Sequence, residues 1–355
     1  MKVGFLGFPG SGKTTLFNVV TGRVEYPAQT GRPESHLAVV KVPDDRLFRL
    51  AEILSSKEII QPEMTFVDLA PLHRENGDGG QRDGLMKLVG DAAALALVIQ
   101  CFGEFDAEGN PLDPADDLES LLLEMTITDL GVVERRLERI EAELKSSRDK
   151  SSAERTLLQR VASHLGEGKL VADLDLTEEE TMVLRGFALL THKPLLVVLN
   201  VAEDDLDGER CRAAAQVAQE MGLACEIIAA TLEEEIAALE DEMRDAFLAD
   251  YGLSRPARDR FIRACYDLLG VITFFTGNHK DARGWTIEGG RTVRDAGGKI
   301  HSDIYDGFIR AEITPFAKLD ELGSFAACRQ AGVMRLEGRD YLTEDGDYLD
   351  IRFSR

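Results

Sequence analysis

Short apolar runs, each long enough for a β-strand, recur along the chain. In the segments between them, apolar and polar residues follow other patterns. Residues 2–6 (KVGFL), 64–70 (MTFVDLA) and 193–199 (KPLLVVL) are three such runs. Continuous apolar runs are typical of strands buried on both faces of a parallel sheet. Residues 14–20 (TTLFNVV) follow the first run after a loop at residues 7–13 and predict the start of a helix. The pattern predicts an α/β fold built on a parallel sheet.

Between residues 117 and 190 the apolar residues instead follow a helical period. They recur every three or four positions with charges between them, as in a coiled-coil seam. The polar stretch 145–152 predicts a turn, and residues 157–165 suit a returning helix. We expect a helical insertion here, either an ordinary helical subdomain of an enzyme or an arm that contacts partners. The seam residues are Leu130, Val133, Leu137, Ile140 and Leu144.

The last part of the chain has a third character. Residues 271–276 (VITFFT) are rich in strand formers, and glycine-rich turns follow them. We therefore predict a β-rich C-terminal domain over 271–355. The α/β domain would then consist of residues 1–116 and 191–270, on either side of the helical insertion.

Charge and cysteine content narrow the classes of function. The 355 residues carry 64 acidic against 41 basic side chains, for a net charge of -23. This charge disfavours nonspecific nucleic-acid binding, without excluding a local basic face on one domain, and gives no sign of a sequence-specific DNA-binding protein. Five scattered cysteines without a C-x-x-C pair argue against a disulfide framework and for the reducing cytoplasm. No apolar run reaches about 18 residues, so we expect neither a membrane span nor a membrane partner. We expect no signal peptide either, because the N-terminus leads straight into the motif described next.

Residues 7–15 (GFPGSGKTT) match the phosphate-binding pattern G-x-x-x-x-G-K-[ST]. The strand before the loop and the helix after it are the context that such a loop needs. We expect Lys13 to reach the β- and γ-phosphates and the Thr14 hydroxyl to bind Mg²⁺. The residues predicted to hold the nucleotide here are Gly10, Ser11, Gly12, Lys13, Thr14 and Thr15.

Two later segments suit the same site. Asp68 lies at the C-terminal edge of the strand predicted within residues 64–70, where a carboxylate that supports Mg²⁺ is expected. Thr30 lies in the loop 26–30 (YPAQT), and its hydroxyl is a second candidate ligand for Mg²⁺. We therefore count Thr14, Thr30 and Asp68 as the candidate metal residues.

The residues after Asp68 bear on hydrolysis. In related sites a glutamine that follows an Asp-x-x-Gly motif orients the attacking water. Here Pro71 stands at the glycine position and Leu72 at the glutamine position. Leu72 cannot hydrogen-bond water, so we expect catalysis to be slow, with Lys13 and Thr30 as its main side-chain contributors. His73 is either a solvated loop histidine or a group that positions the water.

A third segment concerns the base. Residues 193–203 (KPLLVVLNVAE) form a buried run that ends in Asn-x-x-Glu. Guanine-specific sites use Asn-Lys-x-Asp, because the aspartate accepts from guanine N1–H and N2–H₂. Here Asn200 is kept, Val201 replaces the lysine and Glu203 replaces the aspartate. This favours ATP, although GTP stays open because a glutamate could still reach the base.

Together these segments resemble the Obg-like ATPases, the YchF family of translation-factor-related P-loop GTPases. The resemblance spans the chain and rests on GFPGSGKTTLFN, YPAQT, FVDLA, NPLDPADDLESL and the C-terminal segment from FFTGNHKDARGW to YLDIRF. It implies a P-loop G domain, an inserted coiled-coil arm and a C-terminal TGS domain of β-grasp type. It also implies an ATP-preferring, Mg²⁺-dependent hydrolase that associates with ribosomes and acts in translation control or stress response.

The chain departs from that family's usual loop, Leu-Pro-Asn-Val-Gly-Lys-Ser. Gly10 replaces the asparagine associated with potassium activation, and Ser11 replaces the valine. Gln29 replaces a cysteine before the candidate Thr30, and Pro71 lacks the backbone N–H that commonly contacts the γ-phosphate. We therefore do not transfer the potassium activation of that family to this chain. Two alternatives also stay open: a nucleotide-gated binding module that does not hydrolyse, and a GTPase.

Overall fold

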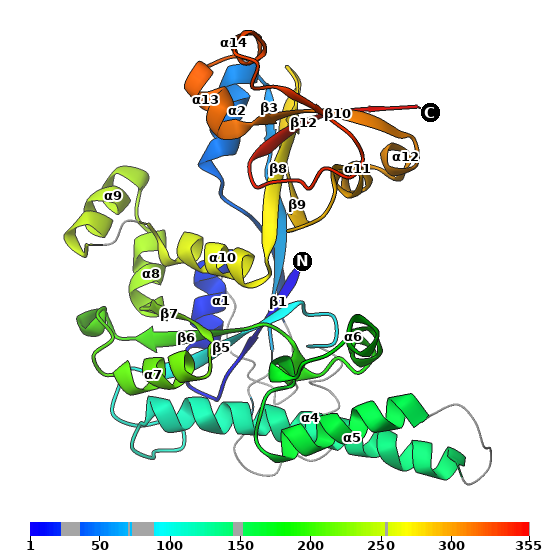
Figure 1. The fold of residues 1–355 in the computed structure, drawn as a ribbon. Helices are drawn as coiled ribbons and strands as arrows, with labels where there is room; N and C mark the ends of the chain where they lie inside the picture. Colours follow the sequence, from blue (N-terminus) through cyan, green and yellow to red (C-terminus); the bar gives the residue numbers. More distant parts are fainter. Residues whose placement is uncertain (23–35, 70–71, 73–88, 145–151, 253–254, 355) are drawn as a thin grey trace. The chain divides into compact units, whose positions relative to one another are not determined.

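The computed structural model describes residues 1–22, 36–69, 72, 89–144, 152–252 and 255–354, and it divides into two compact units (Figure 1). Unit 1 comprises Met1–Val39 and Thr65–Leu268, and unit 2 comprises Val40–Met64 and Leu269–Arg355. These units differ from the predicted boundaries, because residues 40–64 belong to unit 2 and not to the α/β domain, and because unit 2 resumes at Leu269 and not at residue 271. Within the described residues, no helix is both long and apolar enough to cross a membrane.

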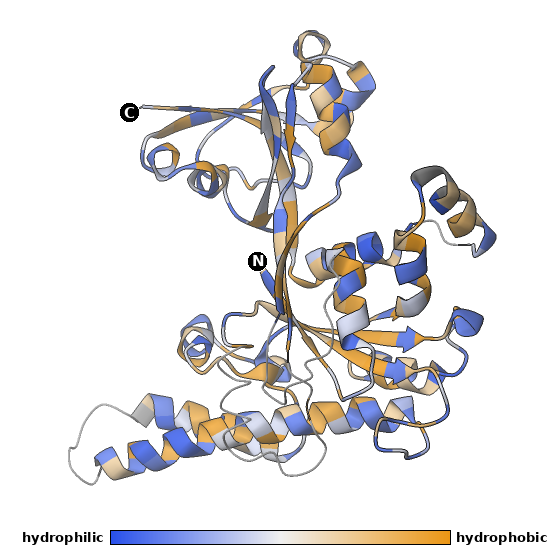
Figure 2. Cartoon of the chain, turned by 180° about the vertical axis from the view of Figure 1, so that it is seen from behind, coloured by the Kyte–Doolittle hydropathy of each residue, from blue (hydrophilic) through white to orange (hydrophobic). Residues whose placement is uncertain are grey.

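Unit 1 is built on a six-stranded sheet of order β2-β4-β1-β5-β6-β7. β1 pairs in parallel with β4 and β5, β5 with β6, and β6 with β7, so the predicted parallel α/β sheet is confirmed. β5 and β6 are buried throughout and apolar except near their carboxyl ends, and in Figure 2 the inner strands are mostly coloured as hydrophobic. The strands are β1 (Lys2–Leu6), β2 (His36–Lys41), β4 (Glu63–Asp68), β5 (Ala94–Cys101), β6 (Leu195–Val201) and β7 (Ala224–Ile228).

Helices cover both faces of this sheet (Figure 1). α4 and α7 lie on one face, and α1, α8 and α10 lie on the other. The helices of unit 1 are α1 (Lys13–Thr21), α4 (Pro114–Leu144), α5 (Ser152–Gly166), α6 (Glu178–Arg185), α7 (Arg212–Glu220), α8 (Ala230–Ala237), α9 (Asp241–Asp250) and α10 (Ala257–Leu268), with short 3-10 turns at η1 (Val171–Asp173), η2 (Leu190–His192) and η3 (Glu203–Asp205).

The predicted helical hairpin is formed by α4 and α5. α4 begins at Pro114, and its first turns pack on the sheet through Leu118, Leu121 and Met125. Farther along, Val133 and Ile140 pack against α5. One continuous helix therefore belongs to both the sheet layer and the arm. The predicted start of the insertion, residue 117, lies inside this helix and not at a break in the chain.

A buried carboxylate fixes the arm to the strand that returns to the sheet. Asp129 of α4 accepts hydrogen bonds from the backbone N–H groups of Leu190 and Thr191, both at 2.8 Å, and from the Thr191 hydroxyl at 2.6 Å. Asp129 is fully buried. These bonds satisfy the N–H groups of η2, directly before β6.

Unit 2 contains a mixed sheet of order β11-β10-β12-β8-β9-β3. β3 comes from the early segment and pairs in parallel with β9. The strands are β3 (Glu58–Ile60), β8 (Val271–Gly277), β9 (Asp281–Glu288), β10 (Phe308–Pro315), β11 (Arg335–Glu337) and β12 (Asp347–Phe353), and the helices are α2 (Asp45–Leu54), α11 (Val293–Ile300), α12 (Ser302–Asp306), α13 (Phe316–Leu322) and α14 (Phe325–Gln330).

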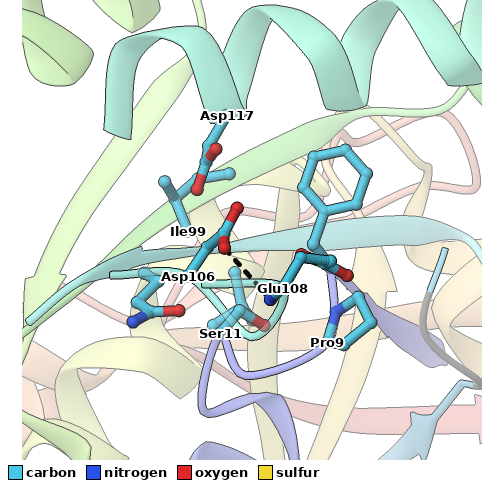
Figure 3. A pocket seen from close by; sticks show the side chains of 9 residues that line it. Pro9, Ser11, Ile99, Asp106, Glu108 and Asp117 are labelled. Carbon is cyan, nitrogen blue, oxygen red and sulfur yellow. Dashed lines mark hydrogen bonds between the residues drawn. The ribbon is translucent and has the colours of Figure 1, made fainter. Parts of the chain in front are cut away.

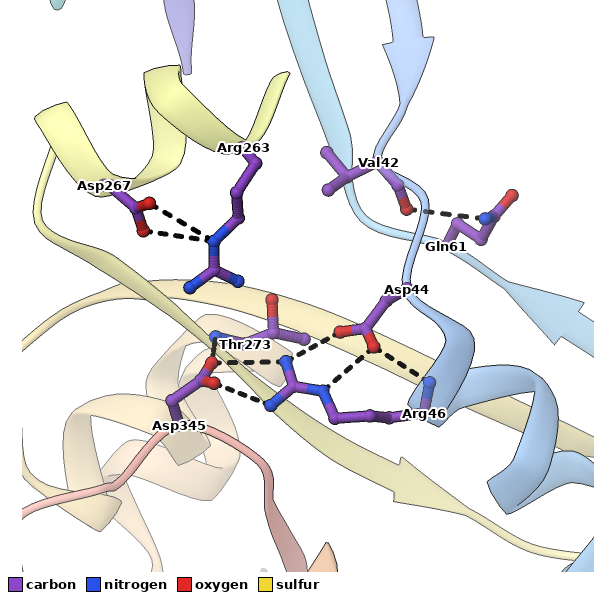
Figure 4. Close-up of polar contacts among 8 residues, drawn as sticks. All are labelled: Val42, Asp44, Arg46, Gln61, Arg263, Asp267, Thr273 and Asp345. Carbon is purple, nitrogen blue, oxygen red and sulfur yellow. Dashed lines mark hydrogen bonds and ion pairs between the residues drawn. The ribbon is translucent and has the colours of Figure 1, made fainter. Parts of the chain in front are cut away.

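The early segment is part of the core of unit 2. Leu47 and Leu50 of α2 are fully buried against Phe275 of β8 and its neighbours. Arg46 donates to Asp44 and to Asp345, and Asp345 also accepts the Thr273 N–H at 2.9 Å (Figure 4). An apolar face and a polar cluster therefore hold residues 40–64 within the C-terminal unit.

Candidate functional site

The phosphate loop, residues 7–14, connects β1 to α1 in unit 1. Gly10 and Gly12 both have φ +81°, a left-handed conformation that glycine adopts without strain. A Cβ on Gly12 would lie 2.1 Å from Nδ2 of Asn200, and one on Gly7 would lie 2.5 Å from the carbonyl oxygen of Val98. The three glycines are therefore required by backbone conformation or by close packing.

The loop leads directly into the N-terminus of α1. Gly12 precedes the helix and has no side chain that could cap it, and its carbonyl accepts from the N–H of Leu16 at 2.9 Å. The first N–H groups of a helix point outward and carry partial positive charge, which favours an anion. The N–H groups of Lys13, Thr14 and Thr15 form this first turn. The geometry suits phosphate oxygens.

Lys13, Thr14 and Asp68 form one hydrogen-bonded group. The Lys13 ammonium lies 2.8 Å from Oδ1 of Asp68, and the Thr14 hydroxyl donates to Oδ2 of Asp68 at 2.8 Å. Lys13 and Asp68 are buried. Asp68 ends β4 beside β1, where the parallel pairing matches it with Phe5. The sheet register thus brings Asp68 to residues that are 54 and 55 positions before it in the sequence.

This group offers oxygen donors of the type that Mg²⁺ prefers. The Thr14 hydroxyl and the Asp68 carboxylate are in contact at the start of α1. Among the described residues, no three histidine, cysteine or acidic side chains gather into a metal site. Mg²⁺ fits here in its usual manner with nucleotides, held by one or two protein oxygens together with phosphate and water. The other candidate ligand, Thr30, lies outside the described residues.

Leu72 lies beside the loop, and its side chain faces the core. Its N–H donates to the carbonyl oxygen of Gly7 at 3.2 Å. The half-buried side chain packs against the main apolar cluster of unit 1. The backbone of Leu72 is thus tied to the start of the phosphate loop. Its neighbours Pro71 and His73 lie outside the described residues.

Asn200 connects the phosphate loop to the turn before α8. Its Nδ2 donates to the carbonyl oxygen of Ser11 at 3.0 Å, and its Oδ1 accepts from the N–H of Ala230 at 3.0 Å. Asn200 is buried. The amide therefore positions two loops, and direct contact with a base stays a prediction.

Val201 and Glu203 lie in different environments. The Val201 side chain is buried in the apolar core, which leaves only its backbone for a nucleotide. Glu203 begins η3 and is exposed. Of the two side chains, only that of Glu203 is placed where a ligand can meet it.

Two further residues border the site that the motifs did not indicate. The ring of Phe102 lies 3.7 Å from the position of a Cβ on Gly12. Gln100 Nε2 donates to the carbonyl oxygens of Phe102 and Phe105, both at 3.1 Å, and fixes the turn after β5. Both residues stand at the carboxyl end of a parallel strand, where ligands bind in such sheets. Their place at the end of a strand was the only feature of the sequence that could have indicated these two residues.

Comparison with known proteins gives consistent results. The family model YchF-GTPase_C, described as a protein of unknown function, matches residues 271–354. A protein of Haemophilus ducreyi named ribosome-binding ATPase YchF is 34% identical over 99% of both chains. A protein of the same name from Bacillus subtilis is 32% identical over 100% of this chain and 99% of its own. The solved structure titled as the Schizosaccharomyces pombe YchF GTPase superposes with a TM-score of 0.83 at 26% identity, covering 99% of this chain and 97% of that one.

Proposed function

The chain belongs to the YchF family, and on that basis we propose that it is a slow, Mg²⁺-dependent ATPase that associates with ribosomes in the cytoplasm. The observation that carries this proposal is the contact of Lys13 and Thr14 with the single carboxylate of Asp68. That group lies at the N-terminus of a helix entered through a glycine loop. The combination suits a nucleoside triphosphate with its metal.

The mechanism follows from where the groups of this site lie relative to the bound phosphates. The N–H groups at the start of α1 hold the phosphates, and Lys13 neutralises charge that develops on them. Thr14 and Asp68 supply the protein oxygens for Mg²⁺, which when bound adds positive charge at the transferring phosphoryl group. A water then attacks the γ-phosphate in line with the leaving oxygen. Leu72 offers no hydrogen bond to that water, which supports slow turnover. Thr30 and His73 remain proposed contributors.

ATP is proposed over GTP for two reasons. The curated relatives are named ATPases, and Glu203 and Val201 stand where guanine-specific sites have aspartate and lysine. GTP remains the competing substrate, because the solved relative from S. pombe is titled a GTPase. A change in nucleotide would not alter the roles of Lys13, Thr14 and Asp68, which contact phosphate and metal and not the base.

Ribosome association is proposed from the relatives, which are named ribosome-binding. The chain's net charge of -23 disfavours contact with bare RNA and favours basic ribosomal proteins. The helical arm of α4 and α5 is a candidate for that contact, because it extends the helix that also packs on the nucleotide-site sheet. We propose that nucleotide state is read out in this way during translation or stress.

Multiple-turnover phosphate release with ATP and with GTP tests the activity. We expect slow release with ATP, less with GTP, and none with Lys13→Ala. If wild type releases no more phosphate than Lys13→Ala but binds ATP, the chain is a nucleotide-gated binding module. Cosedimentation with ribosomes in ADP and in a non-hydrolysable ATP analogue tests the partner. Absence from the ribosomal pellet in both states contradicts the association.

A further inference from the structure

A small cavity lies behind the phosphate loop, on the side facing α4 (Figure 3). Measured as space open to the centre of a water molecule, its volume is about 10 Å³. Its polar lining comes from the loop, from the end of β5 and the turn after it, and from the first turn of α4, through Ser11, Gln100, Asp106, Glu108 and Asp117. In Figure 3 the Asp117 side chain reaches from α4 toward the turn and the loop.

Ser11 contributes a buried hydroxyl that lacks a partner. The residue is 3% exposed, and its Oγ is among the buried side-chain atoms of the described residues that make no hydrogen bond. Such an atom costs about 1–3 kcal/mol when it is left dry. Native structures rarely tolerate this, and the usual explanation is an ordered water. At this position the YchF resemblance predicts valine, so the polar atom is a departure from the family's usual loop.

The other polar groups are suitable partners for one water. Asp106 uses Oδ1 to accept from the N–H groups of Glu108 and Asn110, at 3.0 and 2.7 Å, which fixes its carboxylate in the turn. Asp117 is 6% exposed and lies in the first turn of α4. A water in the cavity would accept from the Ser11 hydroxyl and donate to these carboxylates. That gives it the two to four polar contacts of a stable buried water.

The cavity suits water better than a metal ion. Among the described residues, no three acidic, histidine or cysteine side chains are arranged to hold a metal. A Mg²⁺ ion also needs six oxygens and keeps several of its own waters, for which about 10 Å³ leaves no room. The volume matches a single water, for which about 10–15 Å³ by this measure is sufficient.

We propose that one buried water joins the Ser11 hydroxyl of the phosphate loop to the Asp117 carboxylate of α4. The water makes Ser11 and Asp117 positioning residues, which connect the phosphate loop to the helix that forms the arm. The water itself does not depend on the proposed function. Its consequence, coupling of the arm to nucleotide binding, rests on the proposed ATP site.

Whether Ser11→Val lowers or raises the stability of the protein distinguishes a cavity that holds water from an empty one. Ser11→Val adds methyl groups in place of the hydroxyl and leaves no room for the water. If the water is present, this variant unfolds at a lower urea concentration than wild type, because the Asp117 carboxylate loses a partner. The double variant Ser11→Val, Asp117→Leu then recovers most of that loss. If the cavity is dry, Ser11→Val fills a void, removes an unpaired hydroxyl and unfolds at higher urea, which overturns the proposal.

Crystal structures provide the direct readout. The electron density of wild type should show one water peak between Ser11 and Asp117, and that of Ser11→Val should lack it. Anomalous signal at that peak after exchange into rubidium would identify a cation and overturn the assignment of water. Asp117→Leu, which is similar in size and has no oxygen to accept from the water, should weaken ATP binding about fivefold, as expected for loss of one hydrogen bond of about 1 kcal/mol. Unchanged affinity overturns the coupling alone, and failure of wild type to bind ATP overturns the proposed function without affecting the water.

Discussion

The ammonium of Lys13 lies 2.8 Å from Oδ1 of Asp68, and the two side chains are only 8% and 6% exposed. The other carboxylate oxygen of Asp68 accepts from Thr14 at 2.8 Å. One carboxylate therefore orders both the residue expected to bind phosphate and the residue expected to bind Mg²⁺. A buried charge without its partner is costly, so this pair matters for folding as well as for binding.

Lys13→Met should destabilise the nucleotide-free protein. It leaves Asp68 buried and charged, and the loss of one partner of such a pair costs about 3 kcal/mol. Urea denaturation without nucleotide measures this. Lys13→Met, Asp68→Leu should recover much of the stability but no ATP binding. A single variant as stable as wild type would show that the pair is not buried in solution.

Asn200→Ala should weaken ATP binding and also lower stability. Its amide bonds both the Ser11 carbonyl and the Ala230 N–H, and leaving buried partners unpaired costs about 1–3 kcal/mol. Isothermal titration and urea denaturation measure the two effects.

Glu203→Ala provides the matched control for the Asn200 variant. Glu203 is exposed, so this change should leave stability unchanged. It should alter the ratio of ATP to GTP affinity if Glu203 contacts the base. Equal loss of stability in both variants would contradict a positioning role for Asn200.

The sequence predicted those elements whose causes are local. An apolar run, glycines that the loop conformation requires and the helix after them all lie within residues 2–20, so the strand, loop and helix could be predicted. The place of residues 40–64 could not. β3 has three residues, and its partner β9 lies more than 200 positions later. Nor could the pattern decide whether the Asn200 amide faces a base or a loop, because both roles require asparagine at the end of the same strand.

Stability should depend on pH through Asp129. Burial raises its pKa from 3.8 to about 6, although hydrogen bonds from Thr191 and Leu190 and the charge of Lys193 oppose the rise. The folded state therefore holds the proton more tightly than the unfolded chain. The resulting stabilisation is complete below the unfolded pKa and is lost as the pH rises through about 6.

Comparison with Asp129→Asn isolates this contribution, because asparagine does not titrate. Between about pH 3 and pH 7, wild type should lose about 3 kcal/mol of unfolding free energy relative to the variant. Urea denaturation across this range measures the difference. A constant difference would mean that the pKa of Asp129 is the same in the folded and unfolded states.

Arg46→Met should destabilise unit 2. Arg46 bonds Asp44 and Asp345, and its side chain is 29% exposed, so we expect a loss of about 1–2 kcal/mol after allowance for solvent screening. Thermal unfolding monitored through Trp285, the single tryptophan, reports on this unit. Arg49→Met is the control, since Arg49 on the same helix pairs with the exposed side chains of Glu52 and Asp320. Equal effects of the two changes would contradict the role of the Asp44–Arg46–Asp345 cluster.

Leu72→Gln tests whether the hydrophobic residue alone suppresses hydrolysis. The N–H of Leu72 is bonded to the Gly7 carbonyl and its side chain packs on the core of unit 1. A glutamine with this backbone directs its amide toward apolar atoms and not toward a water at the γ-phosphate. We therefore expect phosphate release within about threefold of wild type and a stability loss of about 1–2 kcal/mol from the buried amide.

Leu72→Ala separates the two effects, because it removes packing without adding a polar group. It should lower stability and also leave phosphate release nearly unchanged. A tenfold or greater increase in phosphate release for Leu72→Gln alone would show that residue 72 leaves the core when ATP is bound. Leucine at that position would then be the direct cause of slow turnover, because a side chain that reaches the attacking water needs a hydrogen-bonding group.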